Sequence, residues 1–164
     1  MAPASIGRPA DSGEPAAPGW RELATVTDAQ RIRWRGHRAR TRWAECGRAW
    51  DAVAVEPMTA GLDALTAMGA GTRDGYRVLV DHLRDRLYVL VPTGSRDVFA
   101  GIPKVRVLSV GHQLLAPIVP QDGTAAADWI SHPDTGTPSA LVAAAPFADR
   151  LRELTALSCT TAVS

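Results

Sequence analysis

The chain has 164 residues, and its 18 lysine and arginine residues against 17 aspartate and glutamate residues give a formal net charge of +1. A chain of this length fits one domain that needs neither a disulfide nor a metal ion for a stable core. Its charge excludes a general attraction of the whole molecule for polyanions, and no apolar run reaches the ~20 residues that cross a bilayer. The two cysteines, Cys46 and Cys159, lack metal-ligand spacing, so we expect free thiols in a cytoplasmic protein with no membrane partner.

The first 40 residues divide into two segments. Residues 1–19 are rich in Pro, Ala, Gly and Ser without apolar periodicity, which predicts disorder, and they lack the apolar core of a signal peptide. Residues 20–40 form an Arg-rich lead-in, in which Asp28 is placed to cap a short helix from about Ala29.

From Thr41 onward the pattern predicts strands and helices in alternation. We expect strands at 41–46 and Asp51–Glu56, followed by a helix at Met58–Met68. A hairpin follows, with strands at 76–83 and 86–92 and a two-residue turn at Arg84-Asp85. The rest of the chain predicts a strand pair at 105–110 and 113–119 joined through Gly111, a short edge strand at Trp129–Ser131 and a helix at Phe147–Leu157. This order predicts an α+β fold with a mixed, largely antiparallel sheet and a few flanking helices. The domain is expected to span residues 41–158, followed by a tail at 159–164.

The segment RIRWRGHRARTRW, at 31–43, carries six arginines and two tryptophans and no acid. Basic side chains with interleaved aromatic rings suit a nucleic-acid backbone and its bases. The other interpretation is a solvated lead-in that Trp34 or Trp43 anchors to the core. The candidate contacts in this segment are Arg31, Arg33, Trp34, Arg35 and Arg38.

The run WDAVAVEP, at 50–57, predicts a buried strand that ends in the carboxylate of Glu56. Strand ends often hold catalytic or metal-binding acids in α/β proteins. The residue that shares the same face of the strand, two positions earlier, is Ala54. The strand therefore offers one acid where paired acids are the usual arrangement.

Three segments in order, WDAVAVEP, RDRLYVLVPTG and RVLSVGHQLLAP, resemble the motif strands of the N-terminal primase/polymerase domain of the bifunctional primase-polymerases, in the archaeo-eukaryotic primase superfamily. The similarity covers about residues 41–132 and is strongest to the short, divergent actinobacterial members. The Leu87-Tyr88 pair matches the family's Leu-Tyr in its second motif, and Ala116-Pro117 matches the end of its third. The resemblance implies a primase/polymerase-like α+β fold and a role in DNA replication.

The resemblance also implies that the catalytic chemistry is lost. Family members bind divalent metal with a pair of acids and a third-strand acid, and hold nucleotide phosphates with a histidine. The acid pair falls here on Ala54 and Glu56, the third acid on Arg106 and the histidine on Arg86. Two-metal phosphoryl transfer needs several carboxylates, and a guanidinium ~4–5 Å from a divalent ion adds repulsion of several kcal/mol at an effective dielectric of ~20. We therefore expect no bound metal or other cofactor and no catalytic residue.

The sequence leaves two possible roles for the arginines at these positions. Arg86 and Arg106 are suited to hold a phosphate by paired guanidinium forks, or they form an ion-pair triad with Glu56, which we favour. The leading hypothesis is a degenerate accessory module that binds single-stranded or primer-template DNA, a nucleotide, or a protein partner. The alternatives are an active primase or nucleotidyltransferase, which would use Mg²⁺ at Glu56 with Asp51 or Asp81, and a purely protein-interaction unit.

Overall fold

The strands of the chain form two antiparallel sheets, which confirms the predicted α+β class. This computed structural model describes residues 13, 15–36, 38–133 and 138–162. The strands are β1 (Thr41–Glu45), β2 (Asp51–Val55), β3 (Val78–Asp81), β4 (Arg86–Val91), β5 (Val105–Leu108), β6 (Gln113–Pro117) and β7 (Asp128–Ser131). The helices are α1 (Trp20–Ala24), α2 (Asp28–Gly36), α3 (Met58–Ala67) and α4 (Ala144–Thr161), with short 3-10 turns η1 (Arg96–Phe99) and η2 (Pro120–Asp122).

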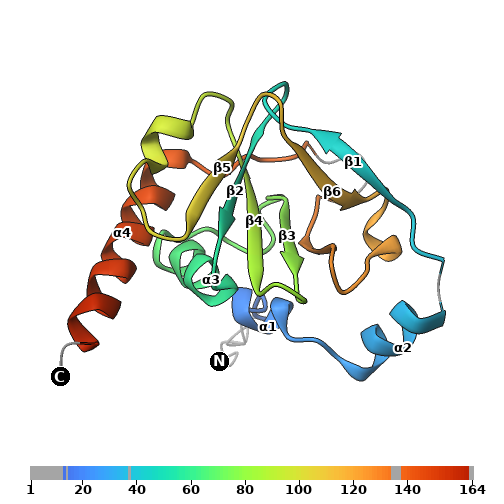
Figure 1. Cartoon of the computed structure of the whole chain (residues 1–164). Coiled ribbons are helices and arrows are strands. Elements are labelled where there is room, and N and C mark those ends of the chain that lie inside the picture. Colours follow the sequence, from blue (N-terminus) through green and yellow to red (C-terminus); the bar gives the residue numbers. More distant parts are fainter. Residues whose placement is uncertain (1–12, 14, 37, 134–137, 163–164) are drawn as a thin grey trace, which may run out of the picture.

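The larger sheet has five strands in the order β5-β2-β4-β3-β7, and β1 pairs with β6 in a separate two-stranded sheet (Figure 1). The strand β7 lies at the edge of the larger sheet, as its short pattern predicts. The strand β2 is paired on both sides and all five of its residues are buried. A strand buried on both faces reads as a near-continuous apolar run, which is how the segment after Trp50 appears in the sequence.

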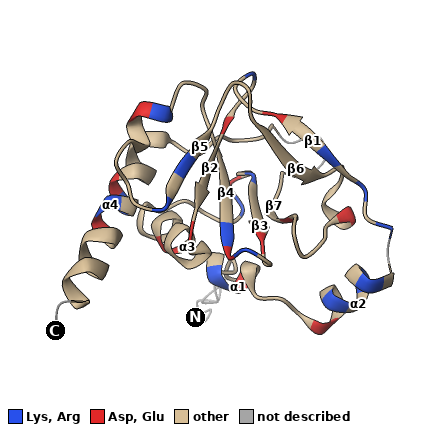
Figure 2. Cartoon of the chain, in the orientation of Figure 1, with Lys and Arg blue, Asp and Glu red and all other residues tan. Residues whose placement is uncertain are grey.

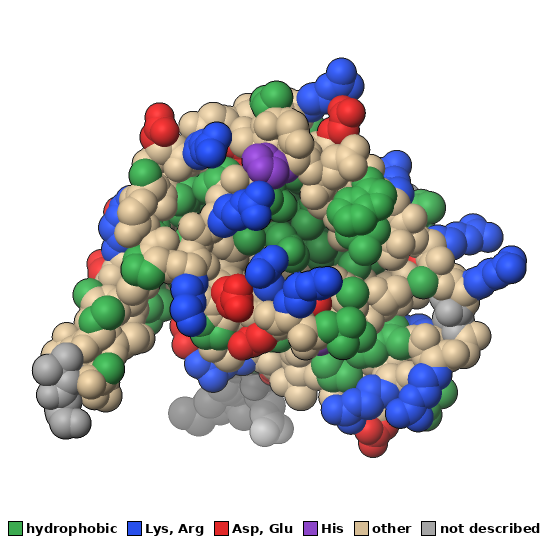
Figure 3. All heavy atoms as spheres, in the orientation of Figure 1, with side chains coloured by type: hydrophobic (Ala, Val, Ile, Leu, Met, Phe, Trp, Pro, Cys, Tyr) green, Lys and Arg blue, Asp and Glu red, His purple; other side chains and the backbone are tan. Residues whose placement is uncertain are grey.

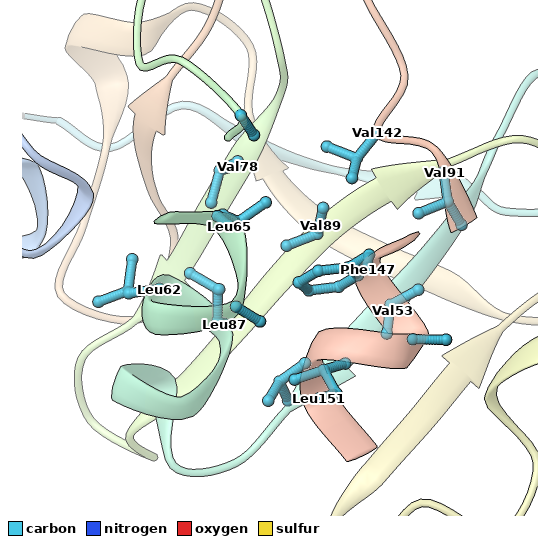
Figure 4. Packing of buried hydrophobic residues seen from close by; sticks show 14 of the residues in the cluster. Val53, Leu62, Leu65, Val78, Leu87, Val89, Val91, Val142, Phe147 and Leu151 are labelled. Carbon is cyan, nitrogen blue, oxygen red and sulfur yellow. The ribbon is translucent and has the colours of Figure 1, made fainter. Parts of the chain in front are cut away.

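The main core lies between the larger sheet and the helices α1, α3 and α4. Side chains that alternate along the strands, such as Val53, Leu87 and Val89, point toward Phe147 and Leu151 of α4 (Figure 4). The helix α3 approaches the sheet closely because it carries Gly61, where a Cβ would stand 2.5 Å from Cδ2 of Leu87. The opposite face of the sheet is covered in part by a smaller cluster that includes Leu114 of β6.

The core includes α1, which precedes the 41–158 unit that the sequence predicts. Trp20 is buried at 2% exposure, and its indole N–H donates a hydrogen bond of 2.7 Å to the carbonyl of Ala70. Residues 15–19 also contact this region, since the carbonyl of Pro18 accepts a hydrogen bond of 2.8 Å from Thr72. Residues 1–12 and 14, for which the sequence also predicts disorder, lie outside the residues that the structure describes.

The predicted hairpin forms, but its two-residue turn is wrong. The pairing of β3 with β4 ends at Asp81 opposite Arg86, so four residues connect the strands. The carboxylate of Asp81 accepts hydrogen bonds from the backbone N–H groups of Leu83 (3.0 Å) and Arg84 (3.1 Å), which stabilises the longer turn. The last residue of this turn, Asp85, accepts from the N–H of Met58 through its backbone carbonyl and its side chain, and so caps the start of α3.

The predicted pairing of strands 105–110 and 113–119 is also wrong. Both strands exist, but β5 pairs with β2 and β6 pairs with β1. The chain turns between them at Ser109, whose carbonyl accepts from the N–H of His112, and the carbonyl of His112 then accepts from Cys46 just after β1. This turn directs β6 away from β5 and leaves the space between them open.

The C-terminal helix is longer than predicted at both ends. It begins at Ala144, because Pro146 falls in the first turn, where its missing N–H costs no helical hydrogen bond. It ends at Thr161, within the predicted tail. In the described part of the chain, none of the helices combines the length and hydropathy that a bilayer span requires.

Both cysteines are free, as the sequence predicts, and they differ in environment. Burial, with a smaller contribution from the charge of Asp51, raises the pKa of Cys46 to about 11, whereas Cys159 is exposed on α4. We expect a thiol-reactive dye at pH 8 to label one thiol of the native protein in minutes and the second only in denaturant. Rapid labelling of two thiols without denaturant would contradict the burial of Cys46.

The Cys46 thiol stays protonated up to about pH 11 in the folded chain but ionises at a lower pH in the unfolded chain. The free energy of unfolding is therefore expected to fall as the pH rises from about 9 to 11.

Candidate functional site

A cleft of about 440 Å³ opens on the face of the larger sheet that α3 and α4 do not cover. Figure 3 shows the hollow with a hydrophobic floor and basic side chains and a histidine around its rim. Its lining includes Ala54, Glu56, Arg86, Tyr88, Lys104, Arg106, Leu108, His112 and Gln113. The four positions that the sequence analysis assigns to a former metal site, Ala54, Glu56, Arg86 and Arg106, all line this one cleft.

Strand register brings these four side chains together. Ala54 of β2 pairs with Tyr88 of β4 on one side and with Arg106 of β5 on the other, so the three side chains share one face of the sheet. Arg86 lies two residues before Tyr88 and points the same way. Glu56 follows β2 directly, and its N–H donates to the carbonyl of Lys104 at 3.1 Å, which continues the pairing of β2 with the β5 segment.

The favoured ion-pair triad is not formed. Glu56 Oε2 lies 3.1 Å from Arg86 Nη2, and the pKa of Arg86 is raised by its hydrogen bond to Tyr88 and then by the one to Glu56. Arg106 has no ion-pair or hydrogen-bond partner among the described residues. The physical reason is the strand register, because Arg86 lies level with Glu56 whereas Arg106 lies opposite Ala54, two residues earlier on β2. Glu56 and Arg86 are both partly exposed, so their ion pair adds little to stability.

The cleft carries an excess of positive charge. Its lining contains three cationic side chains, Arg86, Lys104 and Arg106, and one carboxylate, that of Glu56. Within the described ranges the side chain of Lys104, like that of Arg106, has no hydrogen-bond or ion-pair partner. Unpaired guanidinium and ammonium groups around a concave surface attract anions, and a guanidinium fork matches a phosphate in geometry.

The acids that would complete a metal site lie elsewhere. Asp51 is fully buried, and its Oδ2 accepts hydrogen bonds from the N–H groups of Gly94 (3.0 Å) and Ser95 (3.3 Å). Asp81 is held in the β3–β4 turn and pairs with Arg84 at 2.9 Å. Neither acid lines the cleft, and no group of three or more His, Cys, Asp or Glu side chains suited to a metal ion occurs in the residues that the structure describes. The cleft residues therefore suit an anion better than a divalent cation.

The arginines of segment 31–43 form a second basic surface, on α2 and the chain that leads to β1 (Figure 2). Arg31, Arg33, Arg35 and Arg38 are exposed. Trp34 is half-buried, with its ring 5.5 Å from that of His82, so it holds α2 against the β3–β4 turn. His37 lies outside the described residues. None of these candidate contacts lines the cleft that contains Arg86 and Arg106.

Several residues of the site could not be predicted from the sequence. Lys104, His112 and Gln113 line the cleft because the connections around β5 place them there, and neither motif nor periodicity marks them. Tyr88 was named in the resemblance but not as a cleft residue; its alternation with Arg86 along β4 was the available signal. Of the two expected anchors, Trp43 is 63% exposed, whereas Trp34 contacts His82; Trp20 is a further anchor and is buried in the core.

Comparison with known proteins finds no matching family model, no similar curated sequence and no similar solved structure. The resemblance to the primase-polymerases therefore stays a prediction from the three sequence segments.

Proposed function

We propose that the chain is a catalytically degenerate primase/polymerase-like domain that binds nucleic-acid phosphate groups in its cleft without a metal ion. The observation that carries the proposal is the convergence of Ala54, Glu56, Arg86 and Arg106 in one cleft. Arg86 neutralises the single carboxylate there, and Arg106 is left free to bind an anion. The domain then acts as a cytoplasmic accessory module that holds DNA and transfers no nucleotide.

The geometry does not favour the alternative of an active primase or nucleotidyltransferase. Such an enzyme would need Glu56 to share a metal ion with a second acid. Glu56 is engaged by Arg86, and both Asp51 and Asp81 are hydrogen-bonded outside the cleft.

The proposal predicts that replacing Arg106 by alanine weakens DNA binding. Fluorescence polarisation with a labelled 20-nucleotide oligo-dT, measured between 50 and 200 mM NaCl, should show binding by the wild-type chain that weakens with salt. Arg106→Ala should lose about fivefold to tenfold in affinity at low salt, and the slope of log affinity against log salt should become shallower by about 0.7 for one lost phosphate contact.

Arg150→Ala is the matched control, because this variant also removes one surface arginine, from α4 outside the cleft. It should bind oligo-dT within about twofold of the wild-type chain. No binding by the wild-type chain, or equal losses in the two variants, would refute phosphate binding in the cleft.

A further inference from the structure

Trp43 is a large aromatic side chain that lies near the cleft and is exposed to solvent. Its exposure is 63%, and in the described part of the chain its indole has neither a ring contact nor a hydrogen bond. An exposed indole presents a flat apolar face together with a polar N–H group. The ring of Trp43 is therefore accessible to a ligand.

The register of the small sheet places Trp43 beside the cleft. Trp43 pairs with Leu115 and Glu45 pairs with Gln113, so these four side chains share one face of the β1–β6 sheet. Gln113 also lines the cleft. Two residues of a strand span about 7 Å, so Trp43 stands roughly that far beyond the edge of the cleft. Figure 3 shows hydrophobic side chains continuing from the hollow onto this neighbouring surface.

The cations near Trp43 lie within the cleft, where the side chains of Lys104 and Arg106 line the wall. Arg42, the neighbour of Trp43 on β1, points to the opposite face of the sheet. Glu45 shares the face of Trp43, and its carboxylate lies 3.4 Å from the guanidinium of Arg48, which offsets its charge. Trp43 is thus an aromatic surface beside a basic cleft, a combination by which proteins bind single-stranded nucleic acid through stacked bases and paired phosphates.

We propose that Trp43 is a base-stacking platform, and that the ligand of the cleft is a single strand whose unpaired base lies on this indole while a neighbouring phosphate binds Arg106. This inference rests on the proposed function and adds to it a specificity for unpaired bases. A duplex cannot satisfy the site in the same way, because its bases are stacked on one another and present only their edges.

The test compares two single strands that carry the same phosphates. One is labelled dT8 and the other is an eight-unit abasic strand of equal charge, and both are titrated at 50 mM NaCl with wild-type, Trp43→Ala, Trp43→Phe and Arg106→Ala chains. Leu157→Ala is the control for loss of an exposed apolar side chain, since Leu157 is 65% exposed on α4.

The wild-type chain should bind dT8 about tenfold more tightly than the abasic strand, and Trp43→Ala should lose that difference, because the indole stacks on a base that the abasic strand lacks. Trp43→Phe should keep most of the affinity, Leu157→Ala all of it, and Arg106→Ala should weaken both strands alike. Equal binding of the two strands by the wild-type chain, or no effect of Trp43→Ala on dT8, overturns the stacking platform and leaves phosphate binding in place. Binding of neither strand overturns both proposals.

Discussion

Replacing Trp20 by alanine is expected to lower the free energy of unfolding by about 3–5 kcal/mol, the usual cost of deleting a buried aromatic side chain. The indole is 2% exposed in the main core, and it links α1 to the segment after α3 through its hydrogen bond to the carbonyl of Ala70. The substitution leaves a cavity and also an unsatisfied buried carbonyl, which adds to the loss. Urea denaturation followed by circular dichroism measures the difference, and the melting temperature should fall by roughly 10 °C.

Two further variants show that the effect belongs to this position. Trp20→Phe keeps much of the volume but removes the hydrogen bond, so an intermediate loss of about 1–2 kcal/mol is expected. Trp43→Ala removes an equally large side chain from the surface and should change stability by no more than about 0.5 kcal/mol. If Trp20→Ala proves as mild as Trp43→Ala, α1 is not part of the core.

The role of Trp20 shows where sequence patterns stop being informative. The strands could be predicted because β-rich apolar runs mark β2, β4 and β5 directly. The helix α1 has only five residues, too few for an apolar stripe to repeat, so its tryptophan is indistinguishable in sequence from Trp34 or Trp43. The burial of Trp20 and its hydrogen bond to the carbonyl of Ala70, which the structure shows, distinguish it from the half-buried Trp34 and the exposed Trp43.

Strand partners were harder to predict than strands. The turn between β5 and β6 contains Gly111, which favours a hairpin in the sequence. The hydrogen bond from Cys46 to the carbonyl of His112 instead ties the start of β6 to the end of β1. That contact joins residues 66 positions apart along the chain, and neither the turn residues nor the apolar pattern reports it.

Some residues of the candidate site could be predicted from the sequence, but the ion pair that they form could not. The strand-end acid marks Glu56, and the resemblance to the primase-polymerases implies that Arg86 and Arg106 lie at the same site. Which arginine pairs with Glu56 depends on the strand register, which puts Arg86 level with Glu56 and Arg106 opposite Ala54, and a linear sequence does not contain that register. The resulting asymmetry, with Arg86 engaged and Arg106 free, is what favours anion binding over a closed ion-pair cluster.

Placing acids in the cleft is expected to create a metal-binding site. Ala54 and Arg106 are register partners, so carboxylates at both positions would stand about 5 Å apart at their Cβ atoms, with Glu56 about 7 Å along β2. Converting Arg86 to histidine in the same chain frees Glu56 from its guanidinium partner. The Ala54→Asp/Arg86→His/Arg106→Asp variant should bind Mn²⁺ at least about tenfold more tightly than the wild-type chain in isothermal titration calorimetry, since hard oxygen ligands then converge.

The control for this prediction is the Ala54→Asn/Arg86→His/Arg106→Asn variant, which has the same shape and lacks the two new charges. Because Ala54 is only 7% exposed, an aspartate there is poorly solvated in the absence of metal, and Mn²⁺ should raise the melting temperature of the aspartate variant alone. Circular dichroism establishes that both variants fold. Equal Mn²⁺ binding by the aspartate and asparagine variants would mean that these positions do not converge as a metal site, and the proposal of a degenerate primase/polymerase-like domain would lose its geometric basis.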